Sequence, residues 1–217
     1  YLHYMIGLFK GDFGPSFKYR ARRVNDILGD TFPVSIKLGS MAFIFAILIG
    51  ISFGTLSALR AGGFYDKGGM LAATLGISTP NFVLGALFIL LFSQALGILP
   101  PALWEGPKHF ILPALTLGIP PAAYIARLVR SSVLEVVGQP HVITAEAKGL
   151  SRGAIVLKHI LINAISPVVT ILGPLLAALV TGSFIVEYIF AVPGMGKYFI
   201  TAVTNRDYPL VMGVTLV

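Results

Sequence analysis

Residues 160–186 read ILINAISPVVTILGPLLAALVTGSFIV and contain no charged side chain. A run of about 18 or more predominantly apolar residues is long enough to cross the hydrocarbon core of a bilayer as a helix. Two further uncharged runs, 38–59 and 68–103, meet the same criterion. Only helices satisfy every backbone polar group within one spanning segment. We therefore predict an all-α fold, that of a polytopic helical membrane protein.

The overall composition supports this class. Of the 217 residues, 56% are hydrophobic and 12% are charged, whereas a soluble domain carries about 25% charged residues. The mean hydropathy is +0.86, and the 24 glycines suit membrane helices that approach one another through small residues. We attribute the net charge of +7 to basic residues that flank the spans and contact lipid headgroups, and we expect no nucleic-acid partner.

Charged residues, glycines and prolines mark the boundaries of the predicted spans. Residues 1–33 are polar and predict a loop with a short amphipathic segment before the first complete span, and residues 34–217 hold the transmembrane part. Pro80 predicts a kink inside the second span. Because residue 1 is not Met and the last apolar run is short, we expect the fold to be truncated at both ends. The predicted spans are 34–59, 70–98, 110–130, 160–188 and one that starts near 209, with a short helix at 197–204.

The sequence lacks the patterns of most catalytic and metal sites. It contains no cysteine, which excludes disulfides and thiolate ligands, and its four histidines show no metal-ligand spacing. GMGK at 194–197 lacks the spacing of a phosphate-binding loop, and no GxSxG occurs. No charged residue lies in the middle of a predicted span, so ion coupling is not indicated. We expect no catalytic residue, metal or cofactor in this chain.

A short basic stretch, AEAKGLSRGAIVLKHILINAISPV at 145–168, separates two predicted spans. Pro140 suits the first position of a short helix, Gly149 suits a left-handed residue that ends it, and Ser151 suits the cap of the next helix. Ala145 and Gly149 are four residues apart and share one face, where small side chains would let a partner approach closely. An ordinary interfacial helix is the alternative from spacing alone.

This stretch resembles the cytoplasmic coupling loop, the EAA loop, of ABC importer permeases. More narrowly, it resembles the peptide-importer branch, and the B-type subunit of oligopeptide permeases most of all. The branch typically reads T-A-x-A-K-G-L and then R-H-x-L-x-N-A-x-x-P. The matching residues are Thr144, Ala145, Ala147, Lys148, Gly149, Leu150, His159, Leu161, Asn163, Ala164 and Pro167. Similar blocks are GDFGPSF (11–17), FPVSIKLG (32–39), HFILPALTLG (109–118), IVEYIFAVPGMG (185–196) and NRDYPLV (205–211).

One position departs from the broader family. Its EAA motif begins with Glu six residues before the Gly, where this chain has Ile143, and Glu146 is offset from that position. The peptide branch commonly lacks this Glu, so the departure leaves the resemblance in place.

The resemblance implies an ABC importer type I permease fold in the bacterial plasma (inner) membrane. The loop 131–160 would lie in the cytoplasm and dock on an ATPase subunit, and 1–33 would be extracytoplasmic. The basic residues alone leave this orientation ambiguous. The implied ATPase-coupling residues are Thr144, Ala145, Ala147, Lys148, Gly149, Leu150, Arg152, His159 and Asn163. The implied outer-gate or binding-protein contacts are Glu187, Pro193, Gly194, Gly196, Arg206 and Asp207.

Two sets of charged residues have competing interpretations. Arg127 and Arg130 lie at the C-terminal end of the third predicted span, and we favour a role as headgroup anchors. Glu187 and Asp207 flank the last loop. They would either form salt bridges that hold an outer gate or be solvated loop charges.

The function implied by the resemblance is that of a transmembrane permease subunit of an ATP-driven, binding-protein-dependent importer of oligopeptides, which works by alternating access. Its implied partners are a second, related permease subunit in a heterodimer, two ATPase subunits that bind ATP and Mg²⁺, a periplasmic or extracellular substrate-binding protein, and membrane lipid. One alternative is a permease of the same branch for a dipeptide, nickel, haem or a murein peptide. Another is a stand-alone channel or secondary transporter. No catalytic constellation supports a membrane enzyme.

Overall fold

The computed structural model describes residues 2–19 and 21–217. Tyr1 and Arg20, which belong to the predicted 1–33 segment, lie outside the described residues. Within the described ranges the chain forms helices and loops without a strand. It divides into two compact units. The first comprises Tyr1–Met41, Asn81–Leu117 and Ala178–Val217, and the second comprises Ala42–Pro80 and Gly118–Ala177.

Several helices are long and apolar enough to span a membrane. By length and composition the candidate spans are Val24–Leu59, Pro107–Val137 and Ser166–Ile189, the last of which comprises two consecutive helices. Phe64–Ser78 and Asn81–Ala95 would add a fourth if the pair forms one broken span. The prediction of an all-α polytopic membrane protein is therefore confirmed.

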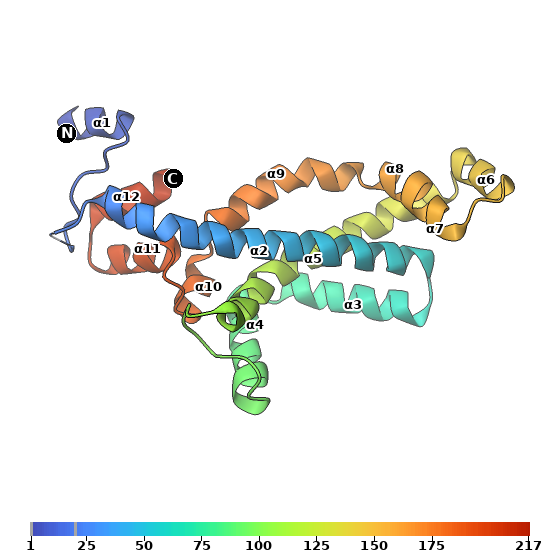
Figure 1. Ribbon diagram of the computed structural model, residues 1–217, viewed down its shortest axis with the longest axis horizontal. Coiled ribbons are helices and arrows are strands. Elements are labelled where there is room, and N and C mark those ends of the chain that lie inside the picture. Colours follow the sequence, from blue (N-terminus) through green and yellow to red (C-terminus); the bar gives the residue numbers. More distant parts are fainter. Residues whose placement is uncertain (1, 20) are drawn as a thin grey trace. The chain divides into compact units, whose positions relative to one another are not determined.

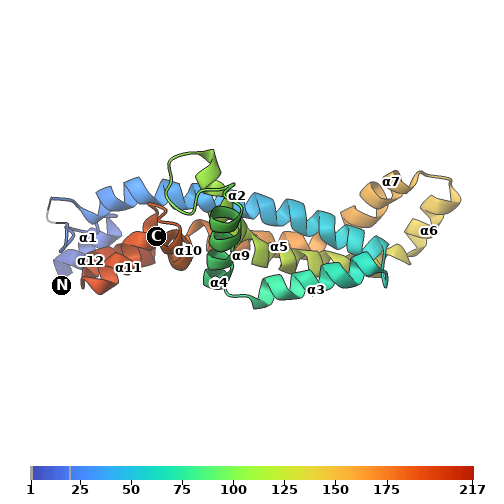
Figure 2. The same ribbon diagram turned by 90° about the horizontal axis from the view of Figure 1, so that it is seen from below.

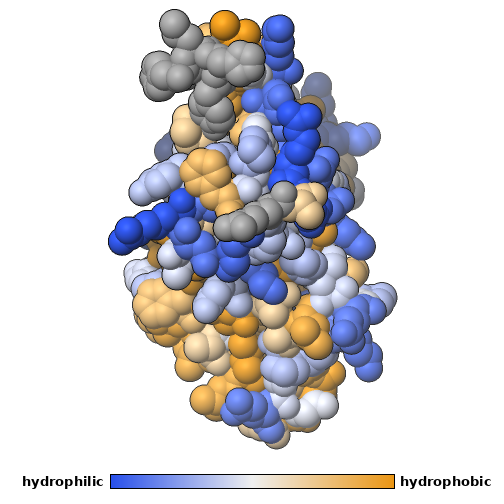
Figure 3. Space-filling model, turned by 90° about the vertical axis from the view of Figure 1, so that its left-hand side faces the viewer, coloured by the Kyte–Doolittle hydropathy of each residue, from blue (hydrophilic) through white to orange (hydrophobic). Residues whose placement is uncertain are grey.

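The first unit has its core where the N-terminal part of α2 meets the two last helices. Val24, Ile27 and Leu28 are spaced three and four residues apart, so they form one buried face that packs with Met195 and Leu210. Figures 1 and 2 show α11 and α12 beside the start of α2. At the end formed by α1, α11 and α12, hydrophilic side chains gather over the middle of the surface (Figure 3). The elements of this unit are α1 (Leu2–Phe9), the start of α2 (Val24–Leu59), α4 (Asn81–Phe88), the π-helix η1 (Ile89–Ala95), the start of α5 (Pro107–Val137), α10 (Phe184–Ile189), α11 (Met195–Thr204) and α12 (Tyr208–Leu216).

The second unit packs around the C-terminal part of α5. Ile125, Val129 and Val133 of α5 are buried against Val142 of α6 and Ile160 of η2. In Figure 1, α6 and α7 follow one another in the loop beyond the end of α5. The elements of this unit are the rest of α2, α3 (Phe64–Ser78), the rest of α5, α6 (Pro140–Ala147), α7 (Arg152–Ile155), the π-helix η2 (Val156–Leu161), α8 (Ile162–Ala164) and most of α9 (Ser166–Val180).

Small residues let α2 and α5 approach closely inside the second unit. A Cβ added at Gly50 would lie 2.8 Å from the carbonyl oxygen of Ala122, and one at Gly54 would overlap the carbonyl oxygen of Ala126. Gly50 and Gly54 are four residues apart, as are Ala122 and Ala126, so each pair lies on one helix face. This is the small-xxx-small pattern by which membrane helices bring their backbones together.

The first predicted span is wrong at its start. Helix α2 begins at Val24 rather than near residue 34, and Pro33 lies inside it. The polar residues of this segment suggested a loop. Asn25 and Asp30 are exposed on α2, however, while the apolar face of the same turns is buried against α11 and α12.

The predicted kink at Pro80 is instead a break between α3 and α4. Thr79 is extended, with φ −87° and ψ 122°, because proline disfavours the helical conformation in the residue before it. Helix α3 begins at Phe64, six residues before the predicted start, and α5 continues to Val137 instead of ending near 130. The predicted span 160–188 is interrupted between α9 and α10, where Gly182 has a φ of +88°.

Candidate functional site

The loop after α5 contains the short helix that the sequence predicts. Pro140 occupies the first turn of α6. Gly149 has a φ of +73°, and the amide of Leu150 donates to the carbonyl of Ala145 at 3.3 Å, so the chain leaves α6 through a left-handed residue. The hydroxyl of Ser151 accepts from the amide of Ala154 and caps α7. All three predicted boundaries are confirmed.

The buried face of α6 holds it against its own chain. Val142 and Ala145 are buried and pack with Ile155 and Ile160. The expectation that Ala145 offers a partner a close approach is therefore wrong, because its small side chain is used inside this unit. A Cβ at Gly149 would meet nothing within 4 Å. The glycine is needed for its left-handed backbone and not for close packing.

The opposite face of α6 and the turn after it are open. Leu150 is 42% exposed and Ile143 is 57% exposed. Lys148 and Arg152 add two positive charges beside them. We call residues 147–152 the exposed loop. The predicted coupling residues that are exposed are Thr144, Ala147, Lys148, Gly149, Leu150, Arg152 and Asn163.

His159 and Asn163 lie beside the first turn of α6, close to His141. Asn163 Nδ2 donates to the carbonyl of His159 at 2.7 Å, and His141 Nε2 lies 3.3 Å from the same carbonyl oxygen. The three residues therefore join the first turn of α6 to η2. His141 did not stand out in the sequence, because its partner lies beyond the intervening loop.

An ion pair that the sequence analysis did not predict joins the first turn of α3 to α5. Asp66 accepts from Arg130 Nε at 2.6 Å and from Arg130 Nη2 at 2.7 Å, and its side chain is 3% exposed. The Ser57 hydroxyl and the Gly62 amide donate to the same carboxylate. The interpretation of Arg130 as a headgroup anchor is thus wrong. It forms a two-pronged, geometrically specific bond within the second unit.

Glu187 is fully buried in the first unit. Its Oε1 accepts from the Ser35 hydroxyl at 2.8 Å, and its Oε2 accepts from the Gly196 amide at 2.7 Å. A Cβ at Gly182, Gly194 or Gly196 would come within 3.0 Å of a carboxylate oxygen. The glycines around Glu187 therefore make room for this carboxylate. A solvated loop charge is ruled out, and no basic side chain pairs with Glu187 among the described residues.

Asp207 is also fully buried, and it ties the N-terminal segment to α12. Its carboxylate accepts from the hydroxyl of Ser16 and from the amides of Phe17 and Lys18. It also caps α12 through the amide of Leu210. Both interpretations of Asp207 from sequence, an ion pair and a solvated charge, are therefore replaced by a hydrogen-bonded anchor.

The two other predicted outer residues remain on the surface. Pro193 and Arg206 are exposed, and Arg206 has a φ of +56°, which is uncommon for a residue with a side chain. The structure thus separates the predicted outer set into exposed residues and residues buried around a carboxylate.

The buried Asp207 predicts an acid-sensitive first unit. Burial raises the pKa of Asp207, but the hydrogen bonds from Ser16, Phe17, Lys18 and Leu210 outweigh it, so the pKa lies below its ordinary value. A lowered pKa contributes stability above the unfolded value of about 3.9, which is lost as the pH falls through the folded pKa. We expect Asp207→Asn to lower the unfolding temperature in detergent at pH 7. The difference from the unmodified protein should shrink below about pH 4. A difference that stays constant with pH would contradict this.

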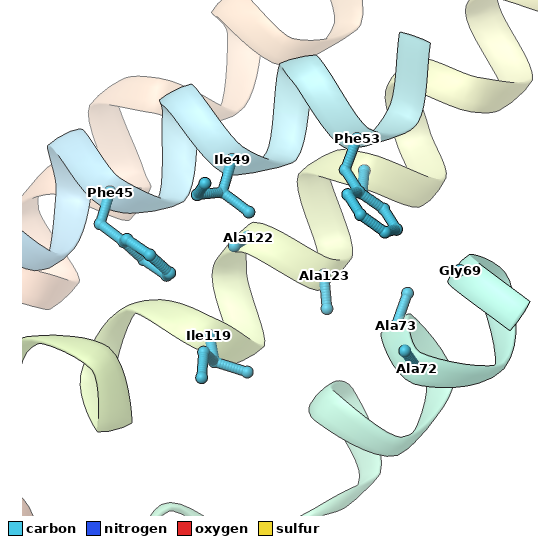
Figure 4. A pocket seen from close by; sticks show the side chains of 10 residues that line it. Phe45, Ile49, Phe53, Gly69, Ala72, Ala73, Ile119, Ala122 and Ala123 are labelled. Atoms are coloured by element: carbon cyan, nitrogen blue, oxygen red, sulfur yellow. The ribbon is translucent and has the colours of Figure 1, made fainter. Parts of the chain in front are cut away.

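An apolar groove of about 150 Å³ lies between α2, α3 and α5 in the second unit. Figure 4 shows Phe45, Ile49 and Phe53 of α2 above the small residues Ala73 of α3 and Ala123 of α5. The residues that line it are apolar, so it offers a packing surface and not a site for a polar substrate. Among residues 2–19 and 21–217, no three His, Asp or Glu side chains converge as metal ligands.

Comparison with known proteins identifies the family. Residues 24–217 match the family described as binding-protein-dependent transport system inner membrane component. The chain belongs to this family. A binding-protein-dependent transport permease of this kind is a component of the inner membrane, and it implies ATPase and substrate-binding partner subunits.

Curated members of the permease family align over the whole chain. The dipeptide transport system permease protein DppB of Bacillus subtilis is 48% identical over 100% of this chain and 70% of its own length. The oligopeptide transport system permease proteins OppB of Haemophilus influenzae and Escherichia coli are 45% and 40% identical, again over 100% of this chain and 71% of their own lengths.

Solved permease structures share the fold. The inward-facing MetNI methionine ABC transporter gives a TM-score of 0.69 at 19% identity and covers 88% of this chain and 87% of its own. An amino acid ABC transporter with histidines gives 0.65 at 19% identity and covers 88% and 86%. The predicted type I importer permease fold is therefore confirmed.

Proposed function

We propose that this chain is a permease subunit of an ATP-driven importer of oligopeptides, and that it forms part of the translocation path by alternating access. The proposal is supported by relatives at 40–48% identity that are named as dipeptide or oligopeptide transport permeases. The solute is carried over from their names. Alternating access requires two conformations of the permease and a source of free energy that favours one of them over the other.

The observation that carries the coupling role is the exposed loop 147–152 on a firmly packed base. Val142 and Ala145 bury one face of α6 against the rest of the unit, whereas Lys148, Leu150 and Arg152 are exposed. A partner that binds the exposed face would move α6 together with α5 and η2, because interdigitated cores transmit displacement. We propose that this partner is an ATPase subunit and that 131–160 is cytoplasmic.

We further propose that ATP and Mg²⁺ bind to separate ATPase subunits and that this chain is not itself an enzyme. In this arrangement two ATPase subunits serve a heterodimer of this chain and a second, related permease. In this proposal the exposed loop is the part of this chain through which ATP binding and hydrolysis in the ATPase subunits change its conformation.

The residues proposed for the outer side act in two ways. Pro193 and Arg206 are exposed and could contact a substrate-binding protein directly, with 1–33 on the same extracytoplasmic side. Glu187 and Asp207 are buried, so they would act by holding the outer loops in shape. Their buried hydrogen bonds give those loops one defined conformation.

Gly149→Leu should abolish peptide uptake and leave membrane insertion intact. Leucine at a φ of +73° is strained by about 1–2 kcal/mol, so the exposed loop would be redirected. Gly149→Asn should retain uptake, because asparagine tolerates the left-handed region. Gly138→Leu is the matched control, since Gly138 is exposed and a Cβ there meets nothing within 4 Å. Unchanged uptake in Gly149→Leu, or failed insertion, would contradict the coupling role.

Affinity purification of the full-length protein from solubilised membranes tests the function itself. Mass spectrometry should find a stoichiometric ATPase subunit with the unmodified chain and with Gly138→Leu, but not with Gly149→Leu. A chain that purifies alone and transports peptide in liposomes without ATP would indicate a channel or a secondary transporter.

A dipeptide is the second candidate solute, because a relative at 48% identity is named as a dipeptide permease. Competition of labelled peptide uptake by dipeptides and by longer peptides separates the two. Inhibition by dipeptides alone would replace the oligopeptide assignment.

A further inference from the structure

A pocket of about 540 Å³ opens in the second unit beside the exposed loop. Its walls come from the C-terminal ends of α2 and α5 and from α6, α7 and η2. Its volume lies in the range of about 300–1,000 Å³ that is typical of small-molecule sites. Of the exposed loop 147–152 only Arg152 lines this pocket, and the coupling role proposed above leaves the other lining residues without a function.

One wall of the pocket is apolar and open. Leu56 and Leu59 at the end of α2 are 54% and 44% exposed, and Leu157 of η2 is 66% exposed. Leu56 and Leu59 end the uncharged run 38–59, and Leu157 lies just before the run 160–186, so in a bilayer all three lie near the end of the hydrocarbon region. A ligand that covers them needs an apolar part.

Two arginines border the same pocket. Arg60 follows α2 directly, and its guanidinium carbon lies 5.0 Å from the centre of the Tyr65 ring, which orients the charged group. Arg152 begins α7. In the part of the chain that the structure describes, neither guanidinium has a carboxylate within 4.0 Å. Both are free to bind an anion, and guanidinium groups bind phosphate oxygens through paired N–H donors.

We propose that this pocket binds one anionic phospholipid. Its headgroup phosphate lies between Arg60 and Arg152, and the start of an acyl chain covers Leu56, Leu59 and Leu157. Basic pockets between membrane helices on the cytoplasmic side suit such headgroups. The inference takes the side of the membrane from the proposed function, but the binding itself needs neither ATP nor peptide.

The charge of the lining favours an anionic lipid over a zwitterionic one. Two arginines and Glu146 line the pocket, which gives a net charge of +1 from two positive charges and one negative. Phosphatidylglycerol, with one negative charge, neutralises this site, whereas phosphatidylethanolamine leaves the excess positive charge unbalanced. Lys148 in the exposed loop adds to the positive potential.

A lipid bound in this pocket would stiffen the base of the exposed loop. Arg60 directly follows the last residue of α2, and Arg152 is the first residue of α7. A phosphate held by both would join these two elements, so the lipid would reinforce the base on which the exposed loop stands.

The test measures lipid retention by the complete transporter in detergent with native mass spectrometry. We expect one phosphatidylglycerol per copy of this chain to be retained in preference to phosphatidylcholine. Arg60→Gln and Arg152→Gln should each weaken phosphatidylglycerol retention about five-fold, since each removes one basic residue from the site. Arg127→Gln is the matched control, because Arg127 is exposed and does not line the pocket. Phosphatidylglycerol retention in this variant should be unchanged.

Three results would overturn the proposal. The first is unchanged retention in the Arg60→Gln/Arg152→Gln double variant. The second is weaker retention in Glu146→Gln, which would indicate that the carboxylate holds an ammonium of a zwitterionic lipid; we expect stronger retention. The third is displacement of the lipid by an equal concentration of glycerol phosphate, which would show that the site recognises a phosphate without its chains. Failure of any ATPase subunit to co-purify would instead count against the proposed function alone.

Discussion

Arg130→Ala should destabilise the second unit by about 3 kcal/mol, because removal of one partner leaves a buried charge unpaired. Asp66, with its side chain 3% exposed, would keep only the Ser57 hydroxyl and the Gly62 amide as donors. Thermal unfolding of the purified protein in detergent should show the loss as a clear fall in the transition temperature. Arg127→Ala, which removes an exposed arginine from the same helix, should change that temperature little.

A double-mutant cycle separates the ion pair from other effects of truncation. In Asp66→Ala/Arg130→Ala no unpaired charge remains, so the double variant should be more stable than Arg130→Ala alone. Arg130→Lys should recover only part of the loss, because an ammonium cannot form both bonds to the carboxylate. Additive losses in the double variant would show that the pair does not act as a unit.

Gly54→Leu should prevent stable packing of α2 against α5, at a cost of about 3 kcal/mol or more. A Cβ there would overlap the carbonyl oxygen of Ala126 and lie 2.8 Å from the Cβ of Val129. Backbone atoms cannot rotate away as a flexible side chain can, so the helices must separate. We expect little protein in the membrane fraction and, for the milder Gly54→Ala, a lowered unfolding temperature.

Gly173→Ala supplies the control for the helix-interior glycine. Gly173 lies in α9, and a Cβ there meets nothing within 4 Å. Because alanine is favoured over glycine in a helix, this change should stabilise slightly, by up to about 1 kcal/mol. A stability loss at Gly173 equal to that at Gly54 would show that the α2–α5 contact is not the cause.

The features that the sequence predicts correctly are those decided by neighbouring residues. Pro140, Gly149 and Ser151 each fix the backbone within one or two residues, so the boundaries of α6 and α7 follow from them. Long uncharged runs likewise decide the fold class without knowledge of any contact. The coupling residues are grouped by resemblance alone. Seven of the nine are exposed, and their coupling role stays a prediction.

The features that the sequence could not predict depend on partners far along the chain. Asp66 lies in α3 and Arg130 in α5, and the elements α4 and η1 separate them along the chain. No neighbouring residue distinguishes Asp66 from an exposed loop carboxylate. Glu187 lies beside an apolar span, so its charge suggested solvent, whereas Ser35 supplies a donor from another helix. At Pro80 the sequence located the disturbance correctly but could not show that the helix stops.

The glycines around Glu187 provide space for a buried side chain and not flexibility. Such a segment is commonly taken as a hinge, but here Gly182, Gly194 and Gly196 surround a carboxylate that a Cβ would displace. Replacement of Glu187 by a smaller side chain would remove the clash with the carboxylate at each position. It would not free Gly196, where a Cβ would also lie 2.7 Å from the backbone Cα of Phe184, or Gly182, whose φ is +88°. Chimeras that graft this segment onto another permease should transfer Ser35, Glu187 and the glycines together. A partial transfer would leave the buried carboxylate without its Ser35 donor or without the space that the glycines provide.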